Sequence, residues 1–496
     1  MHREAMRAQL DAAREPWDVL VIGGGATGLG SALDAASRGL RTALVEQFDF
    51  ASGTSSRSTK LFHGGVRYLR GGHLQLVAQS LRERGTARRQ ARELVKDTAF
   101  LVPSYHAFER AYYAAGLRLY DFLAHDSGTP RSHVVSRAEA LRLAPTLRTG
   151  GLRGGVVYHD DQFDDARFAV ELARAAVARG AVVLNHARVE RFLDDAGRVA
   201  GAVVRDLERG DEIEIRARVV VNATGVHADS VRHLWRASAP SLLRMSRGAH
   251  VVLERSFLPG HTAVLVPRTD DGRVLFLIPW RGRVLVGTTD TPVDTPVDEP
   301  FATPEDIRYL LEHAGRYLSR AVAPSDVRSA FAGLRPLPAG KGRTANLRRD
   351  HRVEVLNGMV TICGGKWTTY RLMARDAIDA AAREGRLLPG TNTHPPAILA
   401  APPASNARLE AAVLDGIPFT PDDVREIERL ARDEMARTVE DVLARRTRAL
   451  FLDAQRSAAA ARPVADVLAR VLGRDASWVE AQVETFSSLA KHYLPG

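Results

Sequence analysis

Three glycines placed between an apolar run and an amphipathic stretch constrain the fold of this chain more than any other feature. Gly23, Gly25 and Gly28 follow the apolar run 19–22 and open a helical pattern that ends at Arg38. In such a strand–turn–helix setting, the G-x-G-x-x-G spacing is typical of a dinucleotide site. It gives a tight turn, backbone amides that approach a pyrophosphate, and close packing of helix on strand. The sequence therefore predicts a Rossmann-type unit.

Two further segments complete the expected nucleotide site. A second apolar strand ends at Glu46, whose carboxylate can accept hydrogen bonds from ribose hydroxyls. Much later, another apolar stretch runs into Ala223, Thr224 and Gly225, small residues that let the backbone approach the cofactor from across the sheet. This returning strand resembles glutathione-reductase-like FAD folds. No second fingerprint follows a strand, so we expect one FAD and no nicotinamide cofactor.

Composition and charge exclude several classes of protein. With 496 residues and 45% hydrophobic content, the chain can bury the cores of two or three domains. The single cysteine, Cys363, excludes an internal disulfide and a cysteine zinc cluster, and no metal site is expected. No uncharged run is long enough to span a bilayer, and residues 1–15 have no apolar core of a signal peptide. The net charge of +10 comes from arginines interleaved with acids, which argues against nucleic-acid binding.

Six segments of the chain carry a more specific pattern. They are Gly53–Leu69 (GTSSRSTKLFHGGVRYL), Tyr158-His159-Asp160, Gly287-Thr288-Thr289-Asp290, Gly333-Leu334-Arg335-Pro336-Leu337, 364–371 (GGKWTTYR) and 441–448 (DVLARRTR). In these segments and their order, the chain resembles the bacterial form of the FAD-dependent glycerol-3-phosphate dehydrogenases, which belong to the D-amino-acid-oxidase-like superfamily. The resemblance implies oxidation of sn-glycerol 3-phosphate to dihydroxyacetone phosphate by hydride transfer to FAD. It also implies that the electrons pass to a membrane quinone.

The resemblance implies a fold class as well. We expect an α/β FAD-binding domain of the glutathione-reductase-like Rossmann type, an α+β substrate domain with an antiparallel sheet, and a C-terminal α-helical domain. The expected boundaries are 1–73, 155–239 and 349–388 for the FAD domain, 74–154 and 240–348 for the substrate domain, 389–403 for a proline-rich linker, and 404–496 for the helical domain. Within the last, Thr420 followed by Pro421 and two acids predicts a capped helix start.

The fingerprint and the resemblance together define the expected cofactor-binding residues. They are Gly23, Gly25, Gly28, Glu46, Thr54, Ser55, Ser56, Lys60, His63, Gly64, Gly65, Val189, Ala223, Thr224, Gly225, Gly365, Lys366 and Thr368. Lys366 follows two glycines at an expected strand-to-helix turn. Its cation can either cap the turn in solvent or stabilise negative charge on a reduced flavin.

The remaining candidates point to an anionic substrate. Arg335 lies between Leu334 and Pro336, and an arginine in an apolar run needs an anion or a buried acid. Guanidinium groups match phosphate oxygens, although pairing with a neighbouring acid is the simpler interpretation of any one arginine. By resemblance, Arg67, Tyr68 and Arg349 bind the substrate near Arg335.

Removal of the hydroxyl proton needs a base, for which His250 is the expected candidate. A single histidine in a strand is more often a core or surface residue, but by resemblance His250 lies in the substrate pocket with Arg335 and Lys366. The expected catalytic residues are therefore His250, Arg335 and Lys366. The sequence leaves open which group takes the proton.

The expected partners follow from the resemblance. They are glycerol 3-phosphate, ubiquinone or menaquinone, membrane lipid contacted peripherally, and a second copy in a homodimer. The expected location is the cytoplasm, on the cytoplasmic face of the inner membrane. Two alternatives stay open: an FAD oxidase of glycerol phosphate or an amino acid that uses oxygen, and a flavoprotein scaffold without activity.

Overall fold

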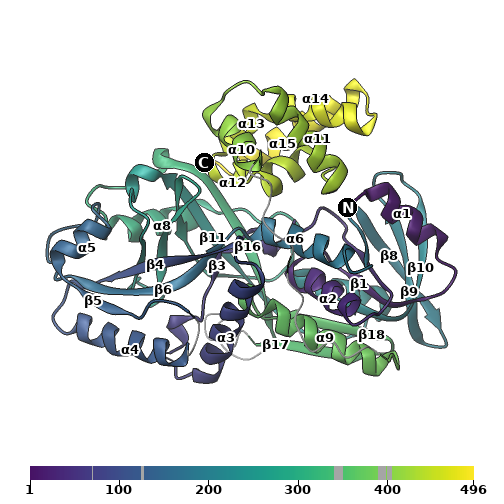
Figure 1. Ribbon diagram of the computed structural model, residues 1–496, viewed down its shortest axis with the longest axis horizontal. Coiled ribbons are helices and arrows are strands. Elements are labelled where there is room, and N and C mark those ends of the chain that lie inside the picture. The colour runs from purple at the N-terminus through teal and green to yellow at the C-terminus, as the bar shows by residue number, and fades with distance from the viewer. Residues whose placement is uncertain (70, 125–127, 340–349, 389–397, 399–404, 496) are drawn as a thin grey trace.

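The structure, a computed structural model, describes residues 1–69, 71–124, 128–339, 350–388, 398 and 405–495. Within these residues the chain forms two sheet-containing parts side by side and a group of helices, α10 to α15, that lies above both (Figure 1). The three parts agree with the predicted fold class, an α/β dinucleotide domain, an antiparallel-sheet domain and a C-terminal helical domain.

The first sheet has the order β17-β18-β10-β1-β2-β7 among the described residues, and β8 and β9 extend β10 as an antiparallel meander. Its strands are β1 (Trp17–Ile22), β2 (Thr42–Val45), β7 (Val182–Leu184), β8 (Ala187–Asp195), β9 (Arg198–Asp206), β10 (Glu212–Asn222), β17 (His351–Leu356) and β18 (Met359–Gly364). Strands β18, β10, β1, β2 and β7 pair in parallel. Their near-continuous apolar sequences fit a sheet that is covered on both faces.

Helices cover this first sheet. They are α1 (Arg3–Ala12), α2 (Ala26–Ser37), α6 (Asp165–Val177), α7 (Ala228–Trp235) and α9 (Tyr370–Glu384). The approach of α2 to α9 is close, because a Cβ added at Gly30 would lie only 3.0 Å from the Tyr370 ring and 3.2 Å from the Cβ of Ala374. The parallel sheet thus holds the carboxyl ends of β1, β2 and β10 next to the start of α2, where a dinucleotide site belongs.

The second sheet has the order β15-β11-β14-β13-β12-β4-β6-β3 among the described residues, with β16 paired to β11 and β5 to β6. Its strands are β3 (Leu61–Phe62), β4 (Val95–Pro103), β5 (His133–Val135), β6 (Gly155–Phe163), β11 (Leu243–Glu254), β12 (Ala263–Val266), β13 (Leu275–Trp280), β14 (Arg283–Gly287), β15 (Thr291–Val293) and β16 (Val327–Pro338). The helices next to it are α3 (Leu74–Gln90), α4 (Glu109–Leu123), α5 (Arg137–Leu143) and α8 (Pro304–Gly315). The long β11–β16 pair runs toward the first sheet (Figure 1).

The C-terminal part is helical. It contains α10 (Ser405–Asp415), α11 (Pro421–Asp433), a π-helical turn (Asp441–Arg446), α12 (Ala449–Leu452), α13 (Ala454–Ala459), α14 (Ala461–Leu472) and α15 (Ala476–Lys491). The start of α11 confirms the predicted cap, since the Thr420 side chain accepts from the Asp423 amide and the Asp423 carboxylate accepts from the Thr420 amide. The expected linker lies outside the described residues except for Ile398.

Buried ion pairs join this helical part to the dinucleotide part. Asp49, fully buried, accepts hydrogen bonds from Arg445 at 2.6 Å and from Arg446 at 2.7 and 3.0 Å. A buried carboxylate is costly unless it is paired and hydrogen-bonded, and these two guanidinium groups provide both. The π-helical turn therefore fixes the loop that follows β2.

Candidate dinucleotide and substrate site

One cavity runs from the glycine turn after β1 to strands β11 and β16. Of the residues expected from the sequence, it is lined by Gly23, Gly25, Glu46, Thr54, Ser55, His63, Val189, Ala223, Thr224, Gly225, His250, Arg335, Gly365, Lys366 and Thr368. Segments far apart in the chain therefore meet at one continuous space. The dinucleotide fingerprint lies at one end of this space, and the candidate catalytic residues His250, Arg335 and Lys366 also line it.

The glycine turn has the close contacts that the fingerprint requires. Gly23 has a φ of +109°, which favours glycine, and a Cβ there would lie 2.7 Å from the carbonyl oxygen of Ala223. A Cβ on Gly28 would lie 1.8 Å from the carbonyl oxygen of Gly23. Gly28 therefore lets α2 pack against the turn, whereas Gly25 lies at the cavity wall.

Glu46 lies where β2 ends. Its carboxylate accepts hydrogen bonds from the amides of Gly24 at 2.6 Å and Phe48 at 2.9 Å. Burial raises the pKa of Glu46, and the two amide hydrogen bonds oppose that shift. Because a carboxylate has about four acceptor positions, this side chain keeps capacity to accept from ribose hydroxyls.

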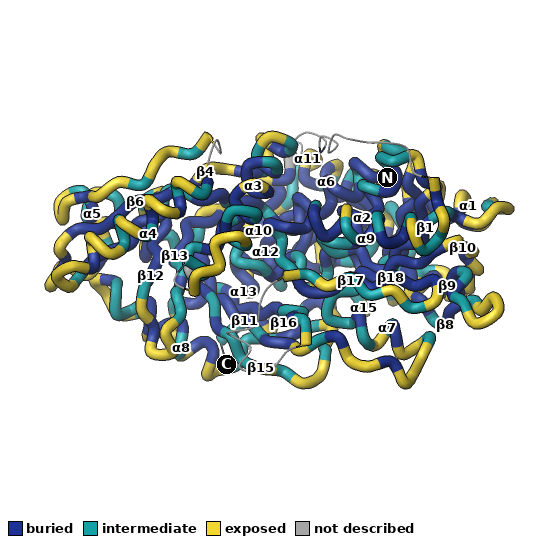
Figure 2. Tube along the Cα trace, turned by 90° about the horizontal axis from the view of Figure 1, so that it is seen from below, coloured by how far each residue is buried: buried dark blue, intermediate teal, exposed yellow. Residues whose placement is uncertain are grey.

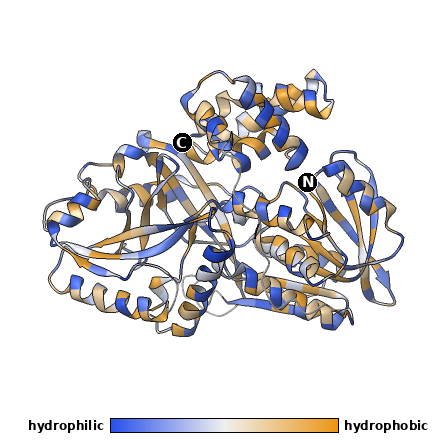
Figure 3. Cartoon of the chain, viewed as in Figure 1, coloured by the Kyte–Doolittle hydropathy of each residue, from blue (hydrophilic) through white to orange (hydrophobic). Residues whose placement is uncertain are grey.

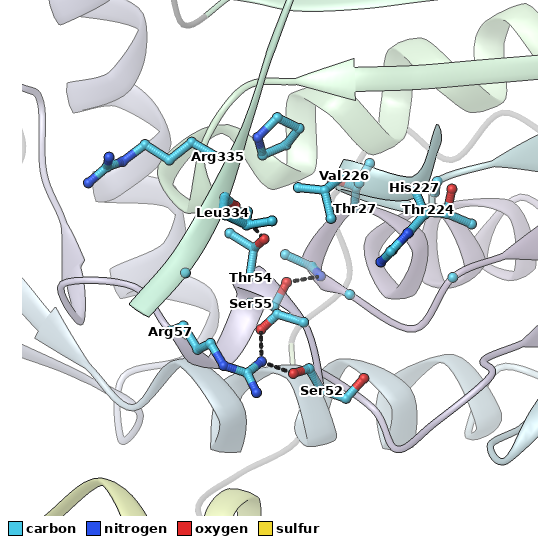
Figure 4. A pocket seen from close by; sticks show the side chains of 18 of the residues that line it. Thr27, Ser52, Thr54, Ser55, Arg57, Thr224, Val226, His227, Leu334 and Arg335 are labelled. Carbon is cyan, nitrogen blue, oxygen red and sulfur yellow. Dashed lines mark hydrogen bonds between the residues drawn. The ribbon is translucent and has the colours of Figure 1, made fainter. Parts of the chain in front are cut away.

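The segment 52–59 lines the middle of the cavity and is tied to both sides of it. Thr54 donates to the carbonyl oxygen of Leu334 at 2.6 Å, and the Ser55 hydroxyl accepts from the Ala26 amide at 2.9 Å. Figure 4 shows Thr54 next to Leu334 of β16 and Ser55 just below Thr54. The segment thus links the second sheet to the first turn of α2.

His250 lies on β11, is 2% exposed, and lines the cavity. Its Nε2 lies 3.0 Å from the Thr59 hydroxyl, and its ring stacks on Phe331 with centroids 4.9 Å apart. Within the described part of the chain, its Nδ1 has no hydrogen-bond partner. Burial lowers the pKa of His250 well below its ordinary value, and the charges of Lys60 and Arg335 add to that effect. The imidazole is therefore neutral at neutral pH and can accept a proton.

Arg335 reaches the cavity through space left by Gly248, where a Cβ would lie 2.0 Å from its Nη2. It donates to the Thr288 hydroxyl at 2.9 Å and to the Thr289 carbonyl at 3.0 Å, and its Nη1 lies 3.2 Å from Asp290. Arg335 therefore pairs with an acid, which is the simpler of the two roles that the sequence allows for it. The same guanidinium lines the cavity, and Asp290 also lies 3.6 Å from Arg273.

Lys366 lies in the turn between β18 and α9, directly after Gly364 and Gly365, both with positive φ. Lys366 lines the cavity, and its Nζ lies 5.5 Å from the centroid of the Tyr68 ring. The Thr368 hydroxyl donates to the His63 carbonyl at 3.2 Å. This turn and the glycine-rich loop that carries His63 and Tyr68 thus form one wall.

Several expected cofactor residues have positions away from the cavity wall. Lys60 is fully buried and donates to Asp165 at 2.7 Å and to the Ser56 carbonyl at 2.6 Å, so its cation holds the core rather than lining the cavity. Gly64 accommodates Tyr120 and Leu81, since a Cβ there would lie 2.6 Å from each side chain. The Ser56 hydroxyl donates to Gly53 at 3.4 Å. A Cβ on Gly65 would lie 3.7 Å from the Lys366 Nζ.

Two substrate candidates cannot be compared with the structure. Arg67 lies in the turn Val66–Tyr68, but only its backbone is described. Arg349 lies outside the described residues. Both stay predictions, as does the grouping of three arginines at one pocket.

The sequence missed two residues that hold the candidate catalytic groups. Thr59 contacts His250 across 191 positions, and Asp290 pairs with Arg335 across 45. Periodicity gives no signal for either pair. Asp290 does stand in the segment Gly287–Asp290, which carries part of the family resemblance, so the sequence offers a signal for an acid near that arginine.

Comparison with known proteins gives matches over nearly the whole chain. The profile of the family described as FAD dependent oxidoreductase matches residues 18–380, and that of the C-terminal domain of alpha-glycerophosphate oxidase matches residues 400–479. A mitochondrial glycerol-3-phosphate dehydrogenase of Arabidopsis thaliana is 44% identical over 406 residues, which cover 78% of this chain and 64% of the relative. A probable mitochondrial glycerol-3-phosphate dehydrogenase of Caenorhabditis elegans also matches, and the match covers 52% of that relative. The chain thus spans less than two thirds of these mitochondrial proteins.

Bacterial proteins match over more of their length. A glycerol-3-phosphate dehydrogenase of Mycobacterium leprae is 40% identical over 517 residues, which cover 96% of this chain and 88% of the relative. Among solved structures, the glycerol-3-phosphate dehydrogenase from Bacillus halodurans complexed with FAD has a TM-score of 0.80 and 30% identity, covering 99% of this chain and 98% of that one.

Proposed function

The chain belongs to the FAD-dependent glycerol-3-phosphate dehydrogenases, and from that premise we propose that it oxidises sn-glycerol 3-phosphate to dihydroxyacetone phosphate and passes the electrons to a membrane quinone. One observation carries the proposal. A single cavity joins the dinucleotide fingerprint to a buried neutral histidine, an arginine and a lysine. Those three groups suit an anionic substrate that must lose a proton and a hydride.

The residues of the cavity fit FAD. The bare backbone at Gly23 and Gly25 and the first turn of α2 would hold the pyrophosphate, and Glu46 would accept from the adenosine ribose. Thr54, Ser55 and Lys366 would lie along the flavin. When bound, FAD supplies a ring that accepts a hydride from the carbon of the substrate alcohol. Lys366 would stabilise the negative charge that the flavin ring gains when it is reduced.

Arg335 would bind the substrate phosphate. A planar guanidinium matches phosphate oxygens, and here a phosphate oxygen would take the place of one of the acceptors that Arg335 has in the structure, which are Thr288, the Thr289 carbonyl and Asp290. Asp290 holds this guanidinium in place at 3.2 Å. We propose Arg67, Tyr68 and Arg349 as further substrate contacts, as the family resemblance implies.

Among the described residues, three histidines line the cavity, and two of them, His63 and His250, are candidates for the proton acceptor. His227 lies 3.1 Å from Asp298, which also accepts from Gln47 beside Glu46, so it belongs to the ribose end. His250 and His63 remain. We propose His250, since its low pKa keeps it neutral and Thr59 fixes its ring.

We expect His250→Gln to slow flavin reduction by glycerol 3-phosphate by about 10²- to 10⁴-fold, the usual contribution of a general base. The matched variant His63→Gln should lose less, and both should retain FAD. Stopped-flow absorbance under anaerobic conditions measures the rates. The pH profile checks the sign: protonation inactivates a base, and burial holds the pKa of His250 well below its ordinary value, so flavin reduction at saturating substrate should decline at a lower pH than an ordinary histidine would give. A larger loss in His63→Gln than in His250→Gln would assign the base to His63.

The electron acceptor is proposed on two grounds. The relatives with high coverage are dehydrogenases, and the sequence has one dinucleotide fingerprint, so NAD has no evident second site. The match of residues 400–479 to a glycerophosphate oxidase domain makes oxygen the second candidate acceptor. We further propose peripheral attachment to the cytoplasmic face of the inner membrane, and a homodimer. In the described part of the chain, no helix has the length and apolarity needed to cross a bilayer.

Anaerobic addition of glycerol 3-phosphate to the purified FAD protein should bleach the flavin. Subsequent addition of a short-chain ubiquinone or menaquinone should restore the yellow colour faster than air-saturated buffer does, since a dehydrogenase reacts slowly with oxygen. Absorbance near the flavin maximum gives both rates. Faster recovery with oxygen, with peroxide formed, would replace the quinone by oxygen. A flavin that stays yellow would identify an inactive scaffold.

A further inference from the structure

The segment 441–448 carries part of the family resemblance, yet all of its residues are described and none of them lines the cavity. It ends at Arg448, which is fully buried and has a φ of +65° although it is not glycine. A bulky residue keeps such a backbone only where its surroundings hold it, and these outliers cluster at functional sites. Strong contacts of the Arg448 side chain must therefore hold this backbone.

The guanidinium of Arg448 binds the turn at residues 56–60 from the side of the C-terminal helices. Its Nη2 donates to the Ser56 carbonyl at 2.7 Å and to Oδ1 of Asp165 at 3.1 Å. The Lys60 ammonium binds the same carbonyl at 2.6 Å and the same carboxylate at 2.7 Å. All four residues are at most 1% exposed. Because charge-assisted hydrogen bonds are strong in a buried environment, the two cations hold this turn in one position.

The same carboxylate continues toward the candidate base. Oδ2 of Asp165 accepts from the Ser58 amide at 3.1 Å and from the Ser58 hydroxyl at 2.7 Å. Thr59 follows directly, and its hydroxyl lies 3.0 Å from the Nε2 of His250. The path from Arg448 through Asp165, Ser58 and Thr59 therefore connects the C-terminal helical part to the imidazole.

The face of the imidazole is connected to the same helices through Phe331. Phe331 lies opposite His250 on β16, and its ring stacks on the imidazole with centroids 4.9 Å apart. Phe451 of α12 packs edge-on against Phe331 with centroids 4.8 Å apart. The Arg448 guanidinium in turn lies 4.2 Å from the centroid of the Phe451 ring. Arg448 thus contacts the start of both paths to His250.

Hydrogen bonds between β16 and the helices keep these rings in place. The Ser329 hydroxyl donates to the Leu450 carbonyl at 2.8 Å, and the Ala330 amide donates to the Tyr493 carbonyl at 2.7 Å. α12 lies next to β16 (Figure 1), and Figure 2 shows mainly buried residues in the middle of the molecule, where both elements are labelled. Figure 3 shows hydrophilic residues among the hydrophobic ones of the C-terminal helices. This buried, partly polar contact fixes β16 relative to the helical part.

We propose that Arg448 is a positioning residue for His250, whose ring it holds in one orientation through the turn at Thr59 and through Phe451. This rests on the proposed function, in which His250 takes the proton of the substrate alcohol. A general base must lie within hydrogen-bonding reach of that proton, and a displacement of about 1 Å can cost roughly 10²-fold in rate. The C-terminal helical part thus contributes to the chemical step, although none of its described residues lines the cavity.

A buried arginine with a purely structural role gives the comparison, and Arg3 is such a residue. It is 2% exposed and donates to Asp206 at 2.8 Å and to the Asn185 carbonyl at 3.0 Å. Asp206 also accepts from Arg7 at 3.2 Å, so loss of Arg3 leaves the carboxylate with a second cation. Neither Arg3 nor these partners line the cavity. Arg3→Met is therefore the matched control for Arg448→Met, which likewise leaves a carboxylate with one remaining cation.

Anaerobic stopped-flow reduction of the FAD protein at saturating glycerol 3-phosphate tests the proposal. Methionine fills much of the space of arginine without its charge or donors, so Arg448→Met should slow the limiting rate by about 10- to 100-fold. Arg448→Lys keeps a charge and a donor and should recover part of that loss. Arg3→Met should stay within about twofold of the wild type, because it affects stability only. Both methionine variants should retain FAD and show a lower Tm.

The background of the His250→Gln variant tests the path of the effect. Arg448→Met should slow reduction little further there, because the ring that it positions is absent. Phe451→Leu removes the ring that packs on Phe331, so it should also slow reduction in the wild-type background, and it takes the place of Arg448→Met if that variant does not fold.

The NMR signal of the His250 ring separates this proposal from the proposed function. In protein labelled with carbon-13 at histidine Cε1, the signal that is missing from His250→Gln identifies this ring. It should shift or broaden in Arg448→Met and stay in place in Arg3→Met. A shifted signal without any flavin reduction in the wild type would support the positioning role and reject the proposed function. An unchanged signal in Arg448→Met would overturn the proposal, as would an equal loss of rate from Arg448→Met with and without His250.

Discussion

Replacing Gly28 by alanine should yield protein without FAD. The added Cβ would lie 1.8 Å from the carbonyl oxygen of Gly23 and 2.9 Å from its carbonyl carbon, both backbone atoms that cannot move without shifting the strand-to-helix turn. We expect the turn to open, the pyrophosphate site to be lost, and the free energy of unfolding to fall by about 3 kcal/mol or more. Flavin absorbance per chain after gel filtration measures the first effect, and thermal unfolding measures the second.

The matched control is Gly315→Ala, at the end of α8, where no atom lies within 4 Å of an added Cβ. It should keep FAD and the wild-type Tm. Gly25→Val tests the cavity side of the turn, because there the nearest atom is the Ser55 hydroxyl at 3.0 Å and the branched side chain would enter the pyrophosphate space. FAD retained in Gly28→Ala at the wild-type ratio would show that the turn does not hold the cofactor.

Replacing Arg335 by alanine should remove most of the activity toward glycerol 3-phosphate. Loss of a buried charged hydrogen bond to phosphate costs about 2 to 5 kcal/mol, or roughly 30- to 4,000-fold in kcat/KM. Arg335→Lys keeps the charge but loses the planar fork, so it should lose less. Glycerol, which lacks the phosphate, should be a poor substrate of the wild type and lose little more in Arg335→Ala.

Asp290 complicates this measurement. In Arg335→Ala its carboxylate loses the guanidinium that lies 3.2 Å away, and its remaining cationic partner is Arg273 at 3.6 Å. The double variant Arg335→Ala/Asp290→Asn removes the uncompensated charge and gives the loss due to phosphate binding alone. Steady-state kinetics with both substrates, together with FAD content, make the comparison. Equal losses for glycerol and glycerol 3-phosphate would mean that Arg335 holds the fold or the flavin rather than the phosphate.

The parts of the fold that depend on local sequence could be predicted. The turn at Gly23 to Gly28 needs a positive φ and close backbone contacts, and only glycine spacing in a strand–turn–helix pattern meets both requirements. The cap at Thr420 likewise follows from residues three positions apart. FAD and the family follow from several such segments read together, and the comparisons confirm both.

The parts that depend on long-range pairing could not be predicted. The resemblance of residues 53–69 to the family's flavin loop predicts Lys60 at the cofactor, yet its ammonium turns inward to Asp165, 105 positions later. Whether a side chain faces the cavity or the core is decided by partners that periodicity does not reveal. The same holds for Thr59 beside His250, where strand β11 brings the histidine to a loop almost two hundred residues earlier in the chain.

The pairing of Asp49 with Arg445 and Arg446 has a consequence for biosynthesis. The two arginines follow the aspartate by 396 and 397 positions, so a ribosome exposes β1, β2 and the loop that carries Asp49 long before it releases the cations that neutralise Asp49. During that interval the carboxylate has to remain in water, since burying it alone is costly. We therefore expect the loop after β2 to close only after Arg445 and Arg446 have been synthesised, and stable loading with FAD to follow translation of the C-terminal helices.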